Sequence, residues 1–163
     1  MLALVGGGIE LLGGDGSSPD RSLQLSSAGR VVRVIDGDTV RVRLKNRTTT
    51  VRYIGVDTPE TVKPGEPVQC FGKRASAYNR ELVAGKRVRL RYGPERRDRY
   101  GRLLAYVFVG GGSRSVSADL IAGGYGRVLV IAPNTQHERP YRRLERIARR
   151  HERGLWRSCP LGD

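Results

Sequence analysis

The feature that most constrains the fold is a series of five short segments with the residue pattern of β-strands. The first is a run of β-branched residues, and the others alternate apolar with polar residues or are apolar throughout. Such short segments, separated by turn residues, are typical of antiparallel strands. They cover residues 31–35, 40–44, 51–53, 87–92 and 103–109. Five strands so close together in the sequence indicate a small β-barrel.

Three further segments have the apolar spacing of α-helices. Residues 73–84 are followed by Gly85, which favours the end of a helix. Residues 115–122 begin with Ser115, a good N-terminal cap. Residues 137–156 combine an apolar stripe with many arginines, which we interpret as a helix with a solvated outer face. We therefore predict an α+β fold, with a five-stranded barrel and about three helices.

Length and charge indicate a single basic domain. The 163 residues fit one compact core, and no apolar run is long enough to cross a membrane. The net charge is +14; residues 1–29 carry one basic and three acidic residues, so residues 30–163 carry +16. We expect residues 1–29 to be a flexible leader or signal-peptide remnant and residues 30–163 to be the folded domain. The charge favours nucleic acid as a partner, although an arginine-rich composition can also give only a solvated surface.

Four carboxylates lie at turns where predicted strands end. Asp36-Gly37 is a hairpin signal, because this pair favours the positive φ of a tight turn. That explanation does not cover Asp38, Asp57 or Glu60. If the two turns meet at one end of a barrel, Asp38 and Asp57 repel each other unless a cation lies between them. Oxygen ligands without nearby Cys or His favour Ca²⁺ or Mg²⁺ over zinc.

Two arginines lie near these acids or on a neighbouring turn. Arg52 precedes the turn of Asp57, and Arg102 ends the segment 98–102. A guanidinium binds phosphate oxygens through paired, charge-assisted hydrogen bonds. Two of them beside a metal could hold a phosphodiester and stabilise the charge of its transition state. The chain has 26 arginines, however, so chemistry alone does not single out these two.

Three motifs, in this order, closely resemble the staphylococcal (micrococcal) nuclease family. They read VIDGDTV at 34–40, VRYIGVDTPE at 51–60 and DRYGRLLAY at 98–106. Shorter similarities follow at 71–72, 75–77, 133–135, 137–138 and 154–156. The resemblance covers about residues 30–158 at nearly the family's spacing, and three motifs together are far more specific than any one of them.

The resemblance implies an OB-fold barrel with three helices and a Ca²⁺-dependent nuclease that cleaves DNA and RNA. By motif position, Asp38 and Asp57 are expected to bind Ca²⁺ through their carboxylates and Thr58 through its main-chain carbonyl. In that family the 5′ P–O bond is broken and a 3′-phosphate remains. We expect a monomer that prefers single-stranded or locally melted nucleic acid.

The resemblance also implies the catalytic and substrate-binding roles. Glu60 is expected to orient or deprotonate the attacking water, and Arg52 with Arg102 to hold the phosphate. Tyr100, with Arg99 beside it, matches the nucleotide site of the family, although packing of Tyr100 against the barrel is an alternative.

One segment departs from the family pattern. Residues 126–132 lack the tyrosines that the family has there, and the segment is one residue shorter. We therefore expect base stacking to be weaker or to come from elsewhere, with more effect on affinity and base preference than on the chemistry.

The two cysteines, Cys70 and Cys159, allow one disulfide. We favour that disulfide over two free thiols of a cytoplasmic protein, because secreted degradative enzymes work in oxidising surroundings. An extracellular or cell-envelope location is the corresponding expectation. His137 and His151 have no metal-type spacing, and we interpret both as structural.

The alternative function is a non-catalytic OB-fold module that binds nucleic acid without cutting it. Such a module has no reason to keep acids and arginines together, because carboxylates weaken phosphate binding when no metal is present. The complete set of three acids and two arginines therefore favours an enzyme. It comprises Asp38, Asp57, Glu60, Arg52 and Arg102.

Overall fold

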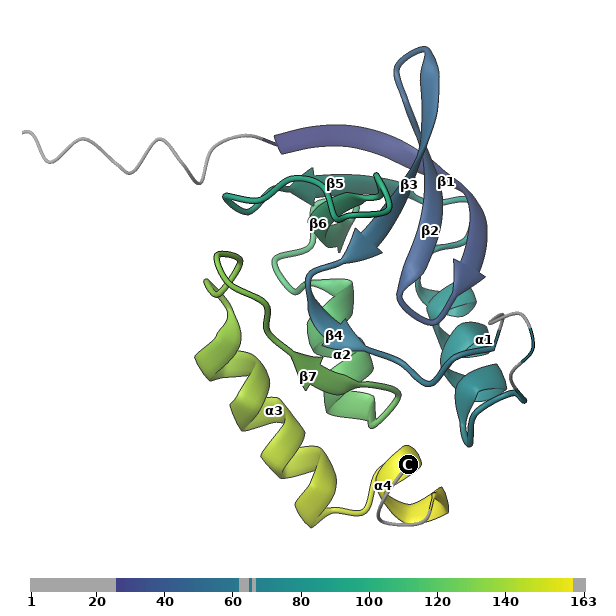
Figure 1. The fold of residues 1–163 in the computed structure, drawn as a ribbon, viewed down its shortest axis with the longest axis vertical. Helices are drawn as coiled ribbons and strands as arrows, with labels where there is room; N and C mark the ends of the chain where they lie inside the picture. The colour runs from purple at the N-terminus through teal and green to yellow at the C-terminus, as the bar shows by residue number, and fades with distance from the viewer. Residues whose placement is uncertain (1–25, 62–64, 66, 160–163) are drawn as a thin grey trace, which may run out of the picture.

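The computed structural model describes residues 26–61, 65 and 67–159, and its centre is a closed five-stranded barrel (Figure 1). The barrel strands are β1 (Ser26–Asp36), β2 (Thr39–Leu44), β3 (Arg47–Tyr53), β5 (Arg87–Arg91) and β6 (Leu103–Val109). Their order around the barrel is β1-β2-β3-β6-β5, and all neighbours are antiparallel except β3 and β6, which run parallel. The barrel and its surrounding helices confirm the predicted α+β OB-fold.

The alternation of side chains along each strand builds the core and distributes the charge. In β2, Val40, Val42 and Leu44 are buried, whereas Arg41 and Arg43 between them are exposed. β5 repeats this pattern, and β6 is buried over most of its length. Because successive side chains of a strand point to opposite faces, the apolar residues fill the barrel and the arginines cover its outside.

Strand β1 begins at Ser26, four residues before the predicted start of the folded domain at Arg30. Its first part pairs with β5 and its second part with β2, and the register shifts twice along the second part. Such irregularities bend a strand and allow it to serve two neighbours. Gly29 permits the close approach, since a Cβ there would lie 2.6 Å from Val42 Cγ1. Residues 26–29, which we expected to belong to the leader, are thus part of β1, and residues 1–25 lie outside the described residues.

Two helices agree with the sequence pattern to within one residue. They are α1 (Gly72–Val83) and α2 (Val116–Gly123). Helix α1 is followed by Gly85 with a positive φ of 69°. The predicted cap of α2 is also present, because the side chain of Ser115 accepts a hydrogen bond from the backbone N of Ala118 at 3.2 Å.

The prediction of a single helix over 137–156 is wrong. The chain forms α3 (Glu138–Arg150), turns, and then forms the short α4 (Leu155–Ser158). Gly154, with φ of 57°, lies directly against Gly124 at the end of α2, and Leu155 N donates to Gly124 O at 2.8 Å. The apolar spacing continues across this break, so only the long-range contact with α2 reveals it.

A second, two-stranded sheet extends from the barrel and was not predicted. β4 (Gly55–Asp57) follows β3 almost directly and pairs antiparallel with β7 (Arg127–Leu129), beside α2 and α3 (Figure 1). Helix α3 supports it, since Glu145 Oε1 accepts a hydrogen bond from Val128 N at 2.9 Å. Across the described segments, no helix has the length and hydropathy that crossing a membrane requires.

Candidate active site

Two turns from separate parts of the chain meet at one end of the barrel and bring four acids together. Asp36 and Asp38 flank the β1–β2 turn, whereas Asp57 ends β4 and Glu60 lies three residues later. Thr58 joins the two turns, because its backbone N and its Oγ1 donate to Asp38 Oδ2 at 2.9 and 3.0 Å. The structure thus contains the meeting of turns on which the expected site depends.

Gly37 has a different role from the one predicted. Its φ is not positive, so the chain does not need glycine for the conformation of the turn. Instead, a Cβ at Gly37 would lie 2.5 Å from Thr58 Oγ1. Glycine is required because the second turn packs directly on the first, and any larger residue would separate Thr58 from Asp38.

Asp36 is buried, and its hydrogen bonds hold together the elements at this end of the barrel. Its carboxylate accepts hydrogen bonds from Thr61 Oγ1 at 2.7 Å and from Thr61 N at 3.3 Å. Its main-chain carbonyl accepts from Asn79 Nδ2 at 2.8 Å, and Asn79 Oδ1 in turn accepts from Tyr53 OH at 2.9 Å. Burial raises the pKa of Tyr53 far above its ordinary value, so its hydroxyl stays neutral. These contacts tie α1 and both turns to the barrel.

Arg52 connects the acids to a neighbouring pocket. Its Nη2 lies 3.2 Å from Asp38 Oδ2 and 2.8 Å from Asp57 Oδ1, and its Nη1 donates to the carbonyls of Tyr53 and Val56 at 3.0 and 2.7 Å. The Arg52 side chain is 13% exposed, so these contacts hold it in a single place. Two carboxylates therefore converge on one positively charged group.

Burial and the neighbouring acids raise the pKa of two of these carboxyl groups, Asp57 and Glu60. Burial raises the pKa of Asp57, and Asp38 adds to this effect while Arg52 opposes it. Burial also raises the pKa of Glu60, and the negative charges of Asp36, Asp38 and Asp57 raise it further. A raised pKa brings a carboxylate nearer to the range in which it can accept a proton during a reaction.

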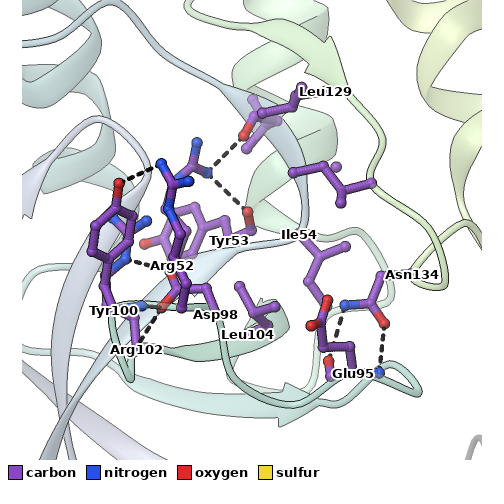
Figure 2. A pocket seen from close by; sticks show the side chains of 14 residues that line it. Arg52, Tyr53, Ile54, Glu95, Asp98, Tyr100, Arg102, Leu104, Leu129 and Asn134 are labelled. Atoms are coloured by element: carbon purple, nitrogen blue, oxygen red, sulfur yellow. Dashed lines mark hydrogen bonds and ion pairs between the residues drawn. The ribbon is translucent and has the colours of Figure 1, made fainter.

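Next to the acids lies a cavity of about 490 Å³ with arginines on one side and an apolar floor (Figure 2). Arg52 and Arg102 both line it, so the structure brings the two arginines of the predicted set to one place. Arg102 Nε donates to Asp98 Oδ2 at 2.6 Å, and its two Nη groups make no hydrogen bond with the described residues. Asp98 thus orients Arg102 and leaves both of its Nη amino groups for a ligand in the cavity.

Tyr100 and Arg99 lie at the rim of this cavity. Tyr100 is 66% exposed, so its ring does not pack against the barrel. The guanidinium carbons of Arg99 and Arg102 lie 4.8 and 5.3 Å from the centre of the ring, and Arg99 Nη2 donates to Tyr100 OH at 2.6 Å (Figure 2). An exposed aromatic ring between cations can stack on a base.

Aliphatic side chains from the segment 126–132, which departs from the family pattern in sequence, line part of the cavity. Leu129 and Ile131 line it and are 40% and 61% exposed. Exposed aliphatic side chains in a cavity can cover the face of a base but lack the aromatic stacking. The apolar run after Gly126 indicated in the sequence that Leu129 and Ile131 lie in an apolar segment. That this segment lines the cavity depends on the pairing of β7 with β4, which the sequence did not show.

Asn134 lines the cavity, which the residue chemistry alone did not indicate. It is 4% exposed. Its Nδ2 donates to Glu95 O at 2.9 Å and its Oδ1 accepts from Glu95 N at 3.1 Å (Figure 2). Asn134 therefore closes one end of the cavity by fixing the loop that follows β5.

The oxygen donors near Arg52 fit a hard cation in their chemistry. Within residues 26–61, 65 and 67–159, no three His, Cys, Asp or Glu side chains form a group that could hold a metal ion. The expected set contains only two such side chains, Asp38 and Asp57, with the main-chain carbonyl of Thr58. Asp38 is fixed by Thr58 and by Thr39 Oγ1 at 2.9 Å, whereas Asp57, which contacts Arg52, is 53% exposed. Carboxylate and carbonyl oxygens are the ligands that Ca²⁺ prefers.

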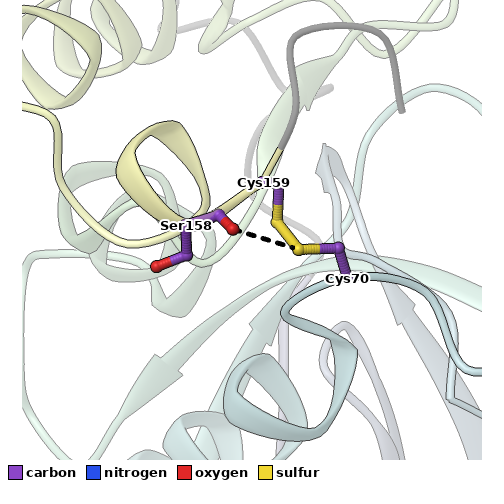
Figure 3. Close-up of a disulfide and its surroundings, with 3 residues drawn as sticks. All are labelled: Cys70, Ser158 and Cys159. Atoms are coloured by element: carbon purple, nitrogen blue, oxygen red, sulfur yellow. Dashed lines mark hydrogen bonds between the residues drawn. A yellow bond between two sulfur atoms is a disulfide. The ribbon is translucent and has the colours of Figure 1, made fainter.

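A disulfide lies close to the acids. Cys70 and Cys159 are bonded to each other, and Cys70 Sγ lies 3.6 Å from the carbonyl oxygen of Ser158 at the end of α4 (Figure 3). A small cavity of about 60 Å³ lies between this disulfide and residues 57–59. The C-terminal end of the described chain is therefore attached beside the turn that carries Asp57 and Thr58.

The two histidines are placed in and beside helix α3. His137 immediately precedes α3 and packs against Tyr106 and Tyr141, with ring centres 4.5 and 5.6 Å away. Burial lowers its pKa, so it stays neutral. His151 caps the other end of α3.

Sequence comparison agrees with this geometry. Residues 50–158 match the family described as "Staphylococcal nuclease homologue". The chain belongs to the staphylococcal nuclease family. The matched region contains Arg52, Asp57, Glu60 and Arg102, and the structure places Asp38, which precedes that region in the sequence, against Arg52.

Curated members of the family are similar over most of the chain. A protein named Thermonuclease from Staphylococcus hyicus is 38% identical over 144 residues, covering 86% of this chain and 84% of that protein. Another Thermonuclease, from Staphylococcus intermedius, is 36% identical over 148 residues, covering 90% and 87%. Endonuclease YncB of Bacillus subtilis is 44% identical over 126 residues, but these make up 76% of this chain and 59% of that protein. The family and these relatives support a hydrolase of the nuclease class.

Proposed function

We propose that this chain is a Ca²⁺-dependent endonuclease that hydrolyses phosphodiester bonds of DNA and RNA with little sugar specificity. The observation that carries the proposal is the position of Arg52. One guanidinium contacts both Asp38 and Asp57 and also lines the cavity that contains Arg102. A phosphate held in the cavity by these arginines therefore lies next to the acids.

In this proposal Asp38, Asp57 and the main-chain carbonyl of Thr58 hold Ca²⁺. The ion supplies Lewis-acid polarisation of a phosphoryl oxygen and a place for water. Asp38 is the rigid ligand because Thr39 and Thr58 fix both of its oxygens, whereas the exposed Asp57 is the adjustable one. A site whose polar groups are arginines and acids recognises the phosphate rather than the sugar, which fits a nuclease with little sugar specificity.

Glu60 accepts the proton of the attacking water. Burial and the surrounding acids raise its pKa, which strengthens it as a base. Arg52 and Arg102 bind the phosphate oxygens and stabilise the additional negative charge of the five-coordinate transition state. Cleavage at the 5′ P–O bond leaves a 3′-phosphate on one product and a 5′-hydroxyl on the other.

Tyr100 and Arg99 bind the nucleotide next to the cleaved bond. The exposed ring of Tyr100 needs a splayed base to stack on, which supports a preference for single-stranded or locally melted substrates. The protein acts as a monomer, and it works outside the cytoplasm or in the cell envelope, where a disulfide such as Cys70–Cys159 is retained.

Digestion of plasmid DNA, denatured DNA and RNA tests this function. The full chain should cut all three with Ca²⁺, should stop when a chelator is added, and should leave ends that a 3′-phosphatase must treat before a polymerase extends them. Binding of nucleic acid without Ca²⁺-dependent cleavage would instead support the alternative of a non-catalytic OB-fold module.

A further inference from the structure

Gln69 and Glu60 form a reciprocal pair of hydrogen bonds across the loop between β4 and α1. Glu60 N donates to Gln69 Oε1 at 2.9 Å, and Gln69 N donates to Glu60 O at 3.0 Å. The start of α1 also packs on this point, since a Cβ at Gly72 would lie 2.8 Å from Glu60 O. The backbone of Glu60 is thus held by Gln69 rather than by a strand or helix of its own.

The disulfide fixes the residue next to Gln69. Cys70 is bonded to Cys159, which directly follows α4. Helix α4 is itself anchored, because Leu155 is 2% exposed and its backbone N bonds Gly124 at the end of α2. A continuous series of contacts therefore leads from the body of the protein through α4 and the disulfide to Gln69, and from Gln69 to Glu60.

The surroundings of Glu60 make such support necessary. Asp36, Asp38 and Asp57 all repel its carboxylate, and its side chain is exposed on one side. Repulsion between like charges favours movement of the Glu60 side chain toward solvent, away from the other acids. A displacement of about 1 Å from the productive position can reduce a rate by roughly 100-fold. The position of Glu60 therefore depends on its backbone contacts.

We propose that Gln69, held in place by the Cys70–Cys159 disulfide, is a positioning residue for Glu60, and that the protein needs this disulfide for full activity. This inference rests on the proposed role of Glu60 as the base. It makes the nuclease an enzyme that works at full rate in an oxidising compartment and loses turnover when its disulfide is reduced.

Two substitutions of Gln69 test the hydrogen bond without touching the disulfide. In Gln69→Leu the side chain keeps its approximate size but cannot accept the bond from Glu60 N, whereas Gln69→Glu keeps an acceptor oxygen. We expect Gln69→Leu to lower kcat by about 10-fold to 100-fold with KM changed less than about 2-fold. Gln69→Glu should lose less kcat than Gln69→Leu, because it keeps the acceptor for Glu60 N even though its added charge lies beside the other acids. Unchanged kcat in Gln69→Leu would overturn the inference.

The disulfide is tested with the Cys70→Ser, Cys159→Ser double variant and with the reduced wild-type protein, at a temperature where circular dichroism shows both folded. Both should lose kcat as Gln69→Leu does. Val88→Ala, in the core of β5 and remote from Glu60, is the matched control, because it lowers the melting temperature without touching the loop. If all variants, including Val88→Ala, lose kcat in proportion to the decrease in their melting temperature, the positioning role is wrong.

Amide hydrogen exchange separates this inference from the proposed function. The Glu60 N–H should exchange faster in Gln69→Leu and in the double cysteine variant than in the wild type and in Gln69→Glu. If the wild type shows no Ca²⁺-dependent cleavage, the proposed function fails whatever the exchange shows. If the wild type cleaves and Glu60 exchange is the same in all variants, the positioning role alone fails.

Discussion

Replacement of Arg52 by alanine tests the contact that connects the acids to the cavity. The side chains of Arg52 and Asp38 are 13% and 7% exposed, so Arg52→Ala leaves a nearly buried carboxylate without its countercharge. Removing one partner of a buried ion pair costs about 3–5 kcal/mol. The pair with Asp57, which is 53% exposed, adds less than about 1 kcal/mol because solvent screens it.

We therefore expect the free energy of unfolding of Arg52→Ala to fall by about 3–4 kcal/mol in urea titrations at pH 7 with a chelator present. Arg41→Ala is the matched control, since Arg41 points outward from β2 and its loss should change stability by less than about 0.5 kcal/mol. Adding Asp38→Asn to Arg52→Ala should restore part of the loss, because it removes the unpaired charge.

The same Arg52→Ala variant should lose about 100-fold to 1000-fold in kcat/KM, because a donor to the transition state is absent. The loss should appear in both kcat and KM, since in the proposed function Arg52 binds substrate as well as the transition state. Stability within about 1 kcal/mol of the wild type, together with unchanged kcat/KM, would refute the assigned role of Arg52.

Three other predictions follow from the same site. Glu60→Gln should lower kcat far more than substrate affinity; it should also raise the melting temperature of the metal-free protein at neutral pH. Because the pKa of Glu60 is raised in the folded protein, its charged form destabilises the fold at pH values above the ordinary carboxyl pKa. The gain in melting temperature should therefore vanish in more acidic buffer. A lowered melting temperature of Glu60→Gln at pH 7 would contradict this prediction. Tyr100→Ala should weaken binding of a single-stranded oligonucleotide by about 1–3 kcal/mol with kcat little changed, measured by fluorescence anisotropy and steady-state kinetics. Arg102→Ala should reduce the slope of log affinity against log salt by about 0.7, whereas an unchanged slope would remove Arg102 from the phosphate contacts.

Much of the barrel could be predicted from local pattern. The apolar residues of β2 and β5 alternate with arginines, and this period alone determines which side of each strand faces the core. The capping of α2 by Ser115 is local in the same sense. Strands β4 and β7 have three residues each, too short for a recognisable period. They form because β4 continues from β3 beside α2 and pairs with β7, which lies against α3.

The remaining differences have long-range causes. The break between α3 and α4 depends on the contact of Gly154 with Gly124, and the need for Gly37 depends on its contact with Thr58. Neither partner is close in sequence. The identities of the site residues came from motif resemblance rather than from chemistry, because 26 arginines offer many possible pairs. The structure adds what the motifs lack, namely that Arg52 contacts Asp38 and Asp57 with the same nitrogen atom.

The rate of oligonucleotide cleavage as a function of free Ca²⁺ tests the central claim most directly. For the wild-type chain we predict no cleavage in chelator, a saturable rise with a single site, and restoration when Ca²⁺ is added back. Asp57→Asn should need at least about 10-fold more Ca²⁺ for half of its maximal rate, because the proposed site then lacks one of its two carboxylate ligands. Equal cleavage with and without chelator, or the same Ca²⁺ dependence in Asp57→Asn, would contradict a cation held by Asp38 and Asp57.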